Sequence, residues 1–198
     1  MLRLVQTQPP ATKAILSNAD MDESALLTAI AEQNTAAFEM FYKIYYPRLY
    51  RFILRMTQFP DVVEELIQET LLVIWDKPHS FNHTSKISTW VFGIAYNKSL
   101  KMMSISKQRS FDIDIDELND SLGDPLANPA HYLENADWLS SAMTTLSAEQ
   151  RAVIELTFYH GFAYQEIAKI LNCPENTVKT RMFHARKKLQ LFVDTEEN

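Results

Sequence analysis

The chain has 198 residues, enough for one ordinary domain or two small ones. Its apolar content of 46% and charged content of 22% exclude a wholly disordered chain. Three scattered glycines and one cysteine exclude a Gly-rich phosphate loop, an internal disulfide and a multi-thiolate metal site. The absence of a long apolar run or a signal-type stretch predicts a cytoplasmic protein that does not insert into a membrane.

The net charge of −6 is unevenly distributed along the chain. Residues 77–109 hold six cations and no carboxylate, whereas residues 110–146 hold eight carboxylates and no cation. An acidic total argues against nucleic acid as a partner, but a separate basic segment weakens that argument. Solvated faces of ordinary helices explain such charge runs equally well.

The pattern along the chain predicts an all-α protein with two small helical domains. Residues 1–19 form a flexible extension, and residues 20–106 form the first domain. Residues 107–133, with two prolines and an acidic cluster, form a flexible acidic linker. Residues 134–198 form the second domain, in which helical periodicity resumes.

The segment 61–76 predicts an amphipathic helix that Asp61 caps. Its apolar face is centred on four residues and widened by three more: Val62, Leu66, Thr70 and Val73, with Val63, Ile67 and Ile74. Its polar face carries Glu64, Glu65, Gln68 and Glu69. Leu72 and Trp75 fall on this polar side, which indicates a docking face for a basic partner helix. Alternatively, the loop that follows, through Phe81, covers them.

The segment 76–101 combines a polar loop with a basic helix. His79 and His83 have a spacing that can bind metal on a helix, but Pro78 and the lack of nearby ligands argue against a metal site. The helix places Ile87, Trp90, Ile94, Asn97 and Lys101 on one face. Aromatic, amide and ammonium groups suit single-stranded DNA. Alternatively, Trp90 and Ile94 belong to the core.

The segment 163–189 predicts a helix-turn-helix unit. A short helix from Ala163 to Leu171 buries Ile167, Ala168 and Leu171. Asn172 suits the left-handed conformation that ends a helix, and Pro174 suits the first turn of the next one. The spacing from Ala168 to Val178 lets two helices cross closely over a tight turn.

The second helix of this unit has a buried stripe formed by Val178, Met182, Ala185 and Leu189. Its opposite face carries Asn176, Thr180, Phe183, His184 and Lys187, flanked by Lys179, Arg181, Arg186 and Lys188. Cations at the flanks and short polar groups at the centre are typical of a helix that reads the DNA major groove. An amphipathic helix that docks on another protein is the alternative.

The order of these motifs resembles the extracytoplasmic-function (ECF) group of bacterial sigma-70-type sigma factors. The resemblance rests on VVEELIQETLLVIW, FNHTSKISTWVFGIAYN and LSAEQRAVIELTFYHGFAYQEIAKILNCPENTVKTR, and covers roughly residues 22–191. The chain is similar to the envelope-stress branch. Among its departures, Tyr96 stands where many members have Arg, and Asn172 replaces a common glycine.

The resemblance implies a sigma factor that binds core RNA polymerase and directs promoter recognition and DNA opening, without enzymatic activity or a cofactor. It implies contacts with the clamp helices of the largest polymerase subunit through Glu64, Glu65, Gln68, Glu69 and Leu72, and with the flap of the second-largest subunit. The −10 element would be bound by Phe81, Asn82, His83, Ser85, Lys86, Trp90, Asn97 and Lys101. The −35 element would be bound by Asn176, Thr177, Lys179, Thr180, Arg181, Phe183, His184 and Lys187. The acidic linker would thread through the RNA exit path, and an anti-sigma factor would regulate the chain.

Two other functions fit parts of this pattern. A conventional helix-turn-helix regulator would sense a ligand through its first domain and bind duplex DNA without polymerase. An interaction protein such as an anti-sigma decoy would keep both domain folds without supporting transcription. Dependence on core polymerase distinguishes the sigma factor from the regulator.

Overall fold

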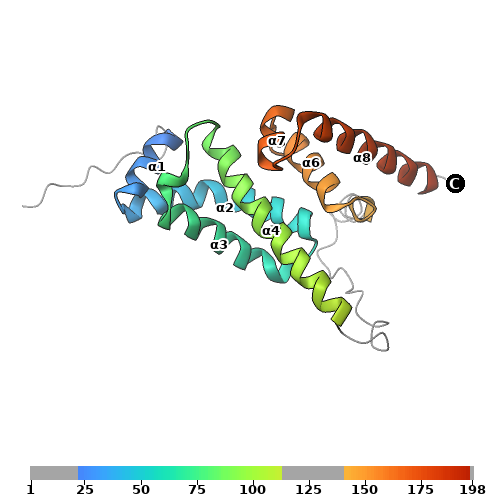
Figure 1. The fold of residues 1–198 in the computed structure, drawn as a ribbon, viewed down its shortest axis with the longest axis horizontal. Helices are drawn as coiled ribbons and strands as arrows, with labels where there is room; N and C mark the ends of the chain where they lie inside the picture. Colours follow the sequence, from blue (N-terminus) through green and yellow to red (C-terminus); the bar gives the residue numbers. More distant parts are fainter. Residues whose placement is uncertain (1–21, 113–140, 197–198) are drawn as a thin grey trace, which may run out of the picture.

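The computed structural model describes residues 22–112 and 141–196, and this part of the chain is built of helices (Figure 1). The first domain contains α1 (Glu23–Ala31), α2 (Thr35–Thr57), α3 (Val63–Asp76) and α4 (Ile87–Asp112), with 3₁₀ turns η1 (Pro60–Val62) and η2 (Pro78–Ser80). The second contains α6 (Ala148–Phe158), α7 (Tyr164–Ile170) and α8 (Glu175–Glu196). The predicted all-α class is confirmed.

Of the predicted domain limits, the structure describes the chain around the one between the first domain and the linker. Helix α4 continues to Asp112, so the first part of the predicted linker is helical. The N-terminal extension, the linker from residue 113 and the start of the second domain up to residue 140 lie outside the described residues.

Polar side chains begin the first two helices. Asp22 accepts a hydrogen bond from the Ser24 amide, and Asn34 accepts bonds from the amides of the second and third residues of α2. The predicted cap of α3 is wrong. Because Pro60 starts a 3₁₀ turn, Asp61 lies within η1, and α3 begins at Val63 without a side-chain cap.

The core of the first domain lies between α2, α3 and α4. Helix α3 buries six side chains: Val63, Leu66, Ile67, Thr70, Leu71 and Ile74. The predicted face is therefore slightly rotated, since Leu71 is buried while Val62 and Val73 are only half-buried. The rotation follows from packing on two sides, because α3 contacts both α2 and α4.

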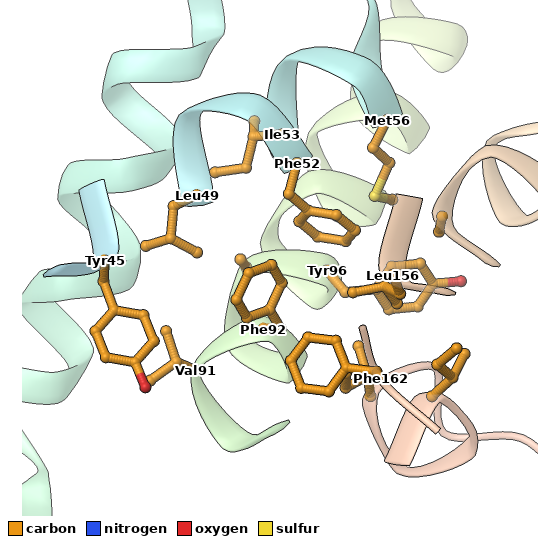
Figure 2. Packing of buried hydrophobic residues seen from close by; sticks show 14 of the residues in the cluster. Tyr45, Leu49, Phe52, Ile53, Met56, Val91, Phe92, Tyr96, Leu156 and Phe162 are labelled. Atoms are coloured by element: carbon orange, nitrogen blue, oxygen red, sulfur yellow. The ribbon is translucent and has the colours of Figure 1, made fainter. Parts of the chain in front are cut away.

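The two domains pack directly against each other. Helix α6 lies on α2, and α7 lies on α4 (Figure 1). Leu156 and Phe162 of the second domain join Phe52 and Phe92 of the first in one apolar cluster (Figure 2). The rings of Phe92 and Phe162 meet edge to face, with their centroids 5.2 Å apart.

A buried guanidinium connects the domains beneath this cluster. Arg151 of α6 is only 8% exposed. Its Nε and Nη2 donate to the backbone oxygen of Met56 at 3.2 and 2.9 Å, and its Nη1 donates to the oxygen of Leu146 at 2.7 Å. Met56 lies in the last turn of α2, where carbonyl groups lack helical partners and carry partial negative charge. Arg151 therefore closes the end of α2.

A buried carboxylate lies one turn further along α6. Glu155 is 1% exposed and faces Arg51 Nε at 3.4 Å and Arg55 Nε at 3.9 Å, both on α2. Burial raises the pKa of Glu155, while the two arginines oppose that shift. The guanidinium of Arg51 also lies over the ring of Tyr159, 3.6 Å from its centroid.

His160 completes the junction between the domains. Its ring lies 4.6 Å from that of Phe92 and near those of Phe52 and Phe162, and its buried Nε2 makes no hydrogen bond with the described residues. Burial lowers the pKa of His160 to about 4, and the nearby Arg48 and Arg51 act in the same direction.

This burial predicts acid-sensitive stability. The unfolded chain takes up a proton at His160 below about pH 6.5, whereas the folded chain does so only near pH 4. The free energy of unfolding is therefore expected to fall between those values, by on the order of 2 kcal/mol after allowance for partial solvent access. Urea denaturation at several pH values measures it. His160→Phe should lose most of this dependence, and His184→Phe, on the exposed face of α8, should retain it. Equal pH slopes in His160→Phe and the wild type would contradict the assignment.

Candidate nucleic-acid interfaces

The predicted helix-turn-helix is present in the second domain. Helix α7 ends at Ile170, and Asn172 adopts a φ of 47°, as predicted for the left-handed turn. The amide of Cys173 donates to the Ala168 oxygen at 3.0 Å and closes the turn. The Pro174 oxygen then accepts the first bonds of α8, from the amides of Thr177 and Val178. The angle between α7 and α8 is therefore set by local backbone bonds.

Helix α8 has the predicted division between a buried and an exposed face. Val178, Met182 and Ala185 are buried, and Leu189 is half-buried. Phe183 is 65% exposed. The other exposed residues among the predicted −35 contacts are Asn176, Lys179, Thr180, His184 and Lys187. These side chains share one accessible surface.

Two of the predicted −35 contacts are less exposed than the others. Thr177 and Arg181 are half-buried. Arg181 Nη1 lies 3.6 Å from Cys173 Sγ. Burial raises the pKa of Tyr96, on the other side of the domain junction, and the positive charge of Arg181 opposes this shift. Arg181 therefore also faces the first domain. A hollow of about 310 Å³ runs along this side of α8, lined by Gln150, Asn176, Thr180, Arg181 and His184 among others.

The loop between η2 and α4 contains five of the eight predicted −10 contacts and is internally ordered. Asn82 Oδ1 accepts bonds from the amide and the hydroxyl of Thr84, at 3.1 and 2.7 Å. His83 adopts a φ of 58°, and its ring packs on that of Phe81. The loop thus has a fixed shape, in which Asn82, His83 and Lys86 are exposed and Ser85 is half-buried.

Phe81 occupies a different position from that expected of a DNA contact. It is buried, and its ring centroid lies 5.4 Å from that of Trp90 on α4. Phe81 therefore supports the loop by packing against both His83 and Trp90. Trp90 and Ile94 are half-buried against the core, as the alternative interpretation proposed, while Asn97 and Lys101 are exposed further along α4.

A second hollow, of about 320 Å³, lies beside this loop. Its wall combines His83, Ser85 and Lys86 with Asp22 and Glu23 at the start of α1. The described residues bring no three metal-ligating side chains together here or elsewhere.

The polar face of α3 presents the predicted docking residues. Leu72 is 55% exposed, and Glu65 and Gln68 are exposed beside it. Trp75 instead packs against Phe38 of α2, with their ring centroids 5.0 Å apart. Leu72 therefore remains the one large apolar group of this set that is open to a partner, and Phe81 does not cover it.

Two carboxylates of this face are oriented by neighbouring helices. Tyr46 of α2 donates a hydrogen bond to Glu64, which raises the pKa of Tyr46 to about 12. Lys98 of α4 forms an ion pair with Glu69 at 2.8 Å. The exposed stripe of Glu65, Gln68 and Leu72 lies between these two contacts.

Sequence reasoning missed several residues that position these surfaces. Tyr46 belongs to a row with Tyr42 and Tyr50, whose four-residue spacing places them on one side of α2, with adjacent ring centroids 5.2 and 6.0 Å apart. That spacing was visible in the sequence. Arg151 and Glu155 gave no comparable signal, because charged residues in a helix usually lie in solvent.

Comparison with known proteins identifies the family of both domains. Residues 41–109 match Sigma-70 region 2, and residues 136–189 match Sigma-70, region 4. The chain is 32% identical over 183 residues to the ECF RNA polymerase sigma factor SigL of Mycobacterium tuberculosis, covering 90% of this chain and 94% of SigL. It is 30% identical over 157 residues to the ECF RNA polymerase sigma factor SigM of Bacillus subtilis, covering 79% of this chain and 95% of SigM.

The chain belongs to the ECF RNA polymerase sigma factors. It therefore functions in transcription initiation, and the predicted family is confirmed. The first domain corresponds to region 2 and the second to region 4.

Solved structures of related proteins have the same fold. The sigma factor RpoE from Bartonella quintana, in complex with the anti-sigma factor NepR, superposes with a TM-score of 0.65 at 30% identity, covering 79% of this chain and 96% of RpoE. CnrH, in complex with the cytosolic domain of CnrY, has a TM-score of 0.62 at 23% identity, covering 86% of this chain and 96% of CnrH. No helix in the described ranges is long and apolar enough to span a bilayer.

Proposed function

We propose that this sigma factor reads the −35 element with the exposed face of α8. The observation that carries the proposal is the separation of residue types on that helix: Val178, Met182 and Ala185 face the core, while amide, hydroxyl and imidazole groups face out. Lys179 and Lys187 lie where they would meet phosphates, and Asn176, Thr180 and His184 where they would meet base edges. Exposed Phe183 fits a thymine methyl group.

The −10 element is assigned to the loop from Asn82 to Lys86 and to the exposed residues of α4. Lys86, with Lys101 on α4, supplies cations for the backbone of a separated strand. Asn82 and His83 offer polar groups on a loop whose shape is fixed before DNA binds. Phe81 and Trp90 hold the loop against α4. DNA opening by this route needs binding energy and no bond chemistry, which fits a protein without enzymatic activity.

The polymerase-binding role is assigned to α3. An exposed leucine beside carboxylates fits an amphipathic basic helix, such as the clamp helices of the largest polymerase subunit. The contacts of Glu64 with Tyr46 and of Glu69 with Lys98 support this assignment, since both carboxylates are held in place before a partner arrives. The flap of the second-largest subunit is expected to contact region 4.

The location and the partners of the protein follow from its role as a sigma factor. A protein that works with RNA polymerase on the bacterial genome acts in the cytoplasm. An anti-sigma factor is an expected partner, since the sigma factor RpoE from Bartonella quintana was solved in complex with the anti-sigma factor NepR. A conventional regulator is disfavoured, because this chain covers 95% of SigM and 94% of SigL, and both relatives are sigma factors.

Transcription in vitro tests the proposal directly. Purified chain and core polymerase from the source organism are incubated with fragmented genomic DNA, and transcript starts are mapped. We expect starts that share paired −35 and −10 elements and appear only when both components are present. Duplex binding without polymerase, together with transcription that is independent of the chain, would support the conventional regulator.

The docking assignment predicts a loss of polymerase affinity in Leu72→Ala combined with Glu65→Gln. Removing an exposed apolar contact and its neighbouring charge should weaken binding by about tenfold or more. Fluorescence anisotropy of labelled protein titrated with core polymerase measures the change. Phe59→Ala, which truncates an equally exposed apolar side chain outside α3, is the matched control and should bind normally. Wild-type affinity in the double variant would contradict the docking site.

The −35 assignment predicts two kinds of effect within α8. Lys179→Ala should weaken transcription from all promoter variants to a similar extent, because phosphates carry no sequence information. Thr180→Ala and His184→Ala should change which −35 base is preferred, with about 1–3 kcal/mol of discrimination lost at one position. Transcription from a library randomised at the −35 element separates these outcomes, with Lys43→Ala on α2 as the charge-matched control. A uniform loss in every α8 variant would contradict base reading by these side chains.

A further inference from the structure

The hollow beside the exposed face of α8 is formed by two elements of region 4. Its volume is about 310 Å³. One wall consists of α8 residues that are assigned to the −35 element, among them Thr180, Arg181 and His184. The other wall consists of Ser147 and Gln150 at the start of α6, and neither belongs to the predicted −35 contacts. A helix in the major groove has a DNA backbone along each flank, so a hollow on this flank lies where phosphate groups pass.

The side-chain amide of Gln150 has one defined orientation. Ser147 and Gln150 form the capping box of α6. Gln150 Oε1 accepts a bond from the main-chain amide of Ser147 at 3.1 Å, and Ser147 Oγ accepts one from the main-chain amide of Gln150 at 3.3 Å. Only the oxygen of a carboxamide can accept a bond from an N–H group, so Nε2 is the atom that points away from this bond. Its two hydrogens have no acceptor among the described residues.

The other polar groups around the hollow favour an anion over a cation. The Thr180 hydroxyl already donates to the Asn176 oxygen at 2.9 Å, within α8. Arg181 carries five N–H donors, and its Nη1 lies 3.6 Å from Cys173 Sγ. No carboxylate is among the described residues that line the hollow. A ligand that enters it therefore meets donors from Gln150 and Arg181.

Glu149, next to Gln150 in the sequence, modifies the charge near this site without lining it. Burial alone would raise the pKa of Glu149, but hydrogen bonds from its own main chain and from Ser147, together with the charge of Arg181, lower it. Glu149 is therefore ionised at neutral pH and offsets part of the charge of Arg181. The affinity of the hollow for an anion then depends on directed donors such as Gln150 Nε2, which is the way in which neutral side chains bind DNA phosphates.

We propose that this hollow binds one phosphate group of the −35 duplex, with Gln150 Nε2 as a donor supplied from outside the helix-turn-helix. Helix α6 packs directly against α8, so a phosphate held by Gln150 sets the rotation and depth of α8 in the groove (Figure 1). Gln150 is thus a positioning residue that reads no base. The proposal rests on the assignment of α8 to the −35 element.

The substitution Gln150→Glu separates the two roles of this side chain. A glutamate keeps the capping box, because its carboxylate also accepts a bond from the Ser147 amide. It replaces the donor with a second oxygen, which repels a phosphate. Gln33→Glu, at an exposed position between α1 and α2, adds the same charge outside region 4 and is the matched control. Circular dichroism melts establish that both variants fold.

The assay uses the holoenzyme formed from the full chain and core polymerase. The DNA is a promoter mapped by transcription in vitro, with a mismatched −10 region so that DNA opening does not limit binding. It carries a single methylphosphonate at successive positions in and beside the −35 element. This group has the shape of a phosphate without its charge. Fluorescence anisotropy of the labelled promoter gives the Kd at each position.

We expect Gln150→Glu to bind the unmodified promoter about tenfold more weakly than the wild type, whatever the base sequence of the −35 element. At one position, a methylphosphonate should restore most of this loss, because it removes the charge that the new carboxylate repels. In the wild type, the same methylphosphonate should weaken binding. Gln33→Glu should match the wild type at every position. If Gln150→Glu does not fold, Gln150→Ala replaces it, and that methylphosphonate should then have no effect.

Wild-type affinity in Gln150→Glu, or a loss that no methylphosphonate restores, would overturn the phosphate site. Thr180→Ala and His184→Ala then identify which assignment failed. If these variants change the preferred −35 base, α8 reads the −35 element and only the phosphate site is wrong. If the base preference is unchanged, the assignment of α8 to the −35 element is wrong as well, whereas polymerase-dependent transcription would still identify a sigma factor.

Discussion

The arrangement of the two domains depends on a pair of buried charges on one face of α6. Arg151 satisfies the backbone oxygen at the end of α2, and Glu155, one turn later, meets Arg51 and Arg55 on the same helix. A buried charge without a partner is strongly unfavourable, so a rotation or a shift of α6 along α2 would disrupt both groups. This requirement fixes both the rotation of α6 and its position along α2. It also sets where α7 and α8, which follow α6 directly, lie relative to the first domain.

The sequence was informative wherever structure is local. The pair Asn172 and Pro174 predicted the turn between α7 and α8, and periodicity predicted the buried stripe of α8, because backbone conformation and helix geometry act over a few residues. Asp61 shows where a local rule failed, since Pro60 imposed a 3₁₀ turn on the residues that would have formed the cap. Phe81 could not be assigned from its polar surroundings, because its burial depends on Trp90 in a different element.

The junction itself could not be predicted, for a physical reason. Its partners are far apart in the sequence, and each looks like an ordinary solvated charge on an amphipathic helix. Arg51 and Glu155 are separated by 104 positions, and Arg151 bonds a backbone oxygen, which no sequence pattern marks. The proposed polymerase-docking face of α3 could likewise be predicted only in part. Periodicity located Glu64 and Glu69, but only the packing of α3 between its neighbours showed that Tyr46 and Lys98 hold them.

Helix α8 has a mechanical property that follows from its length. Its 22 residues form one continuous rod of about 33 Å. The first half carries the buried Val178, Met182 and Ala185 and most of the side chains proposed to read the −35 element, and Lys187, Lys188 and Gln190 in the second half are exposed. Because a helix resists bending over such a length, displacement of its far end also moves its first turns. A protein that displaced the far end of α8 would therefore move the face proposed to read the −35 element without approaching the DNA.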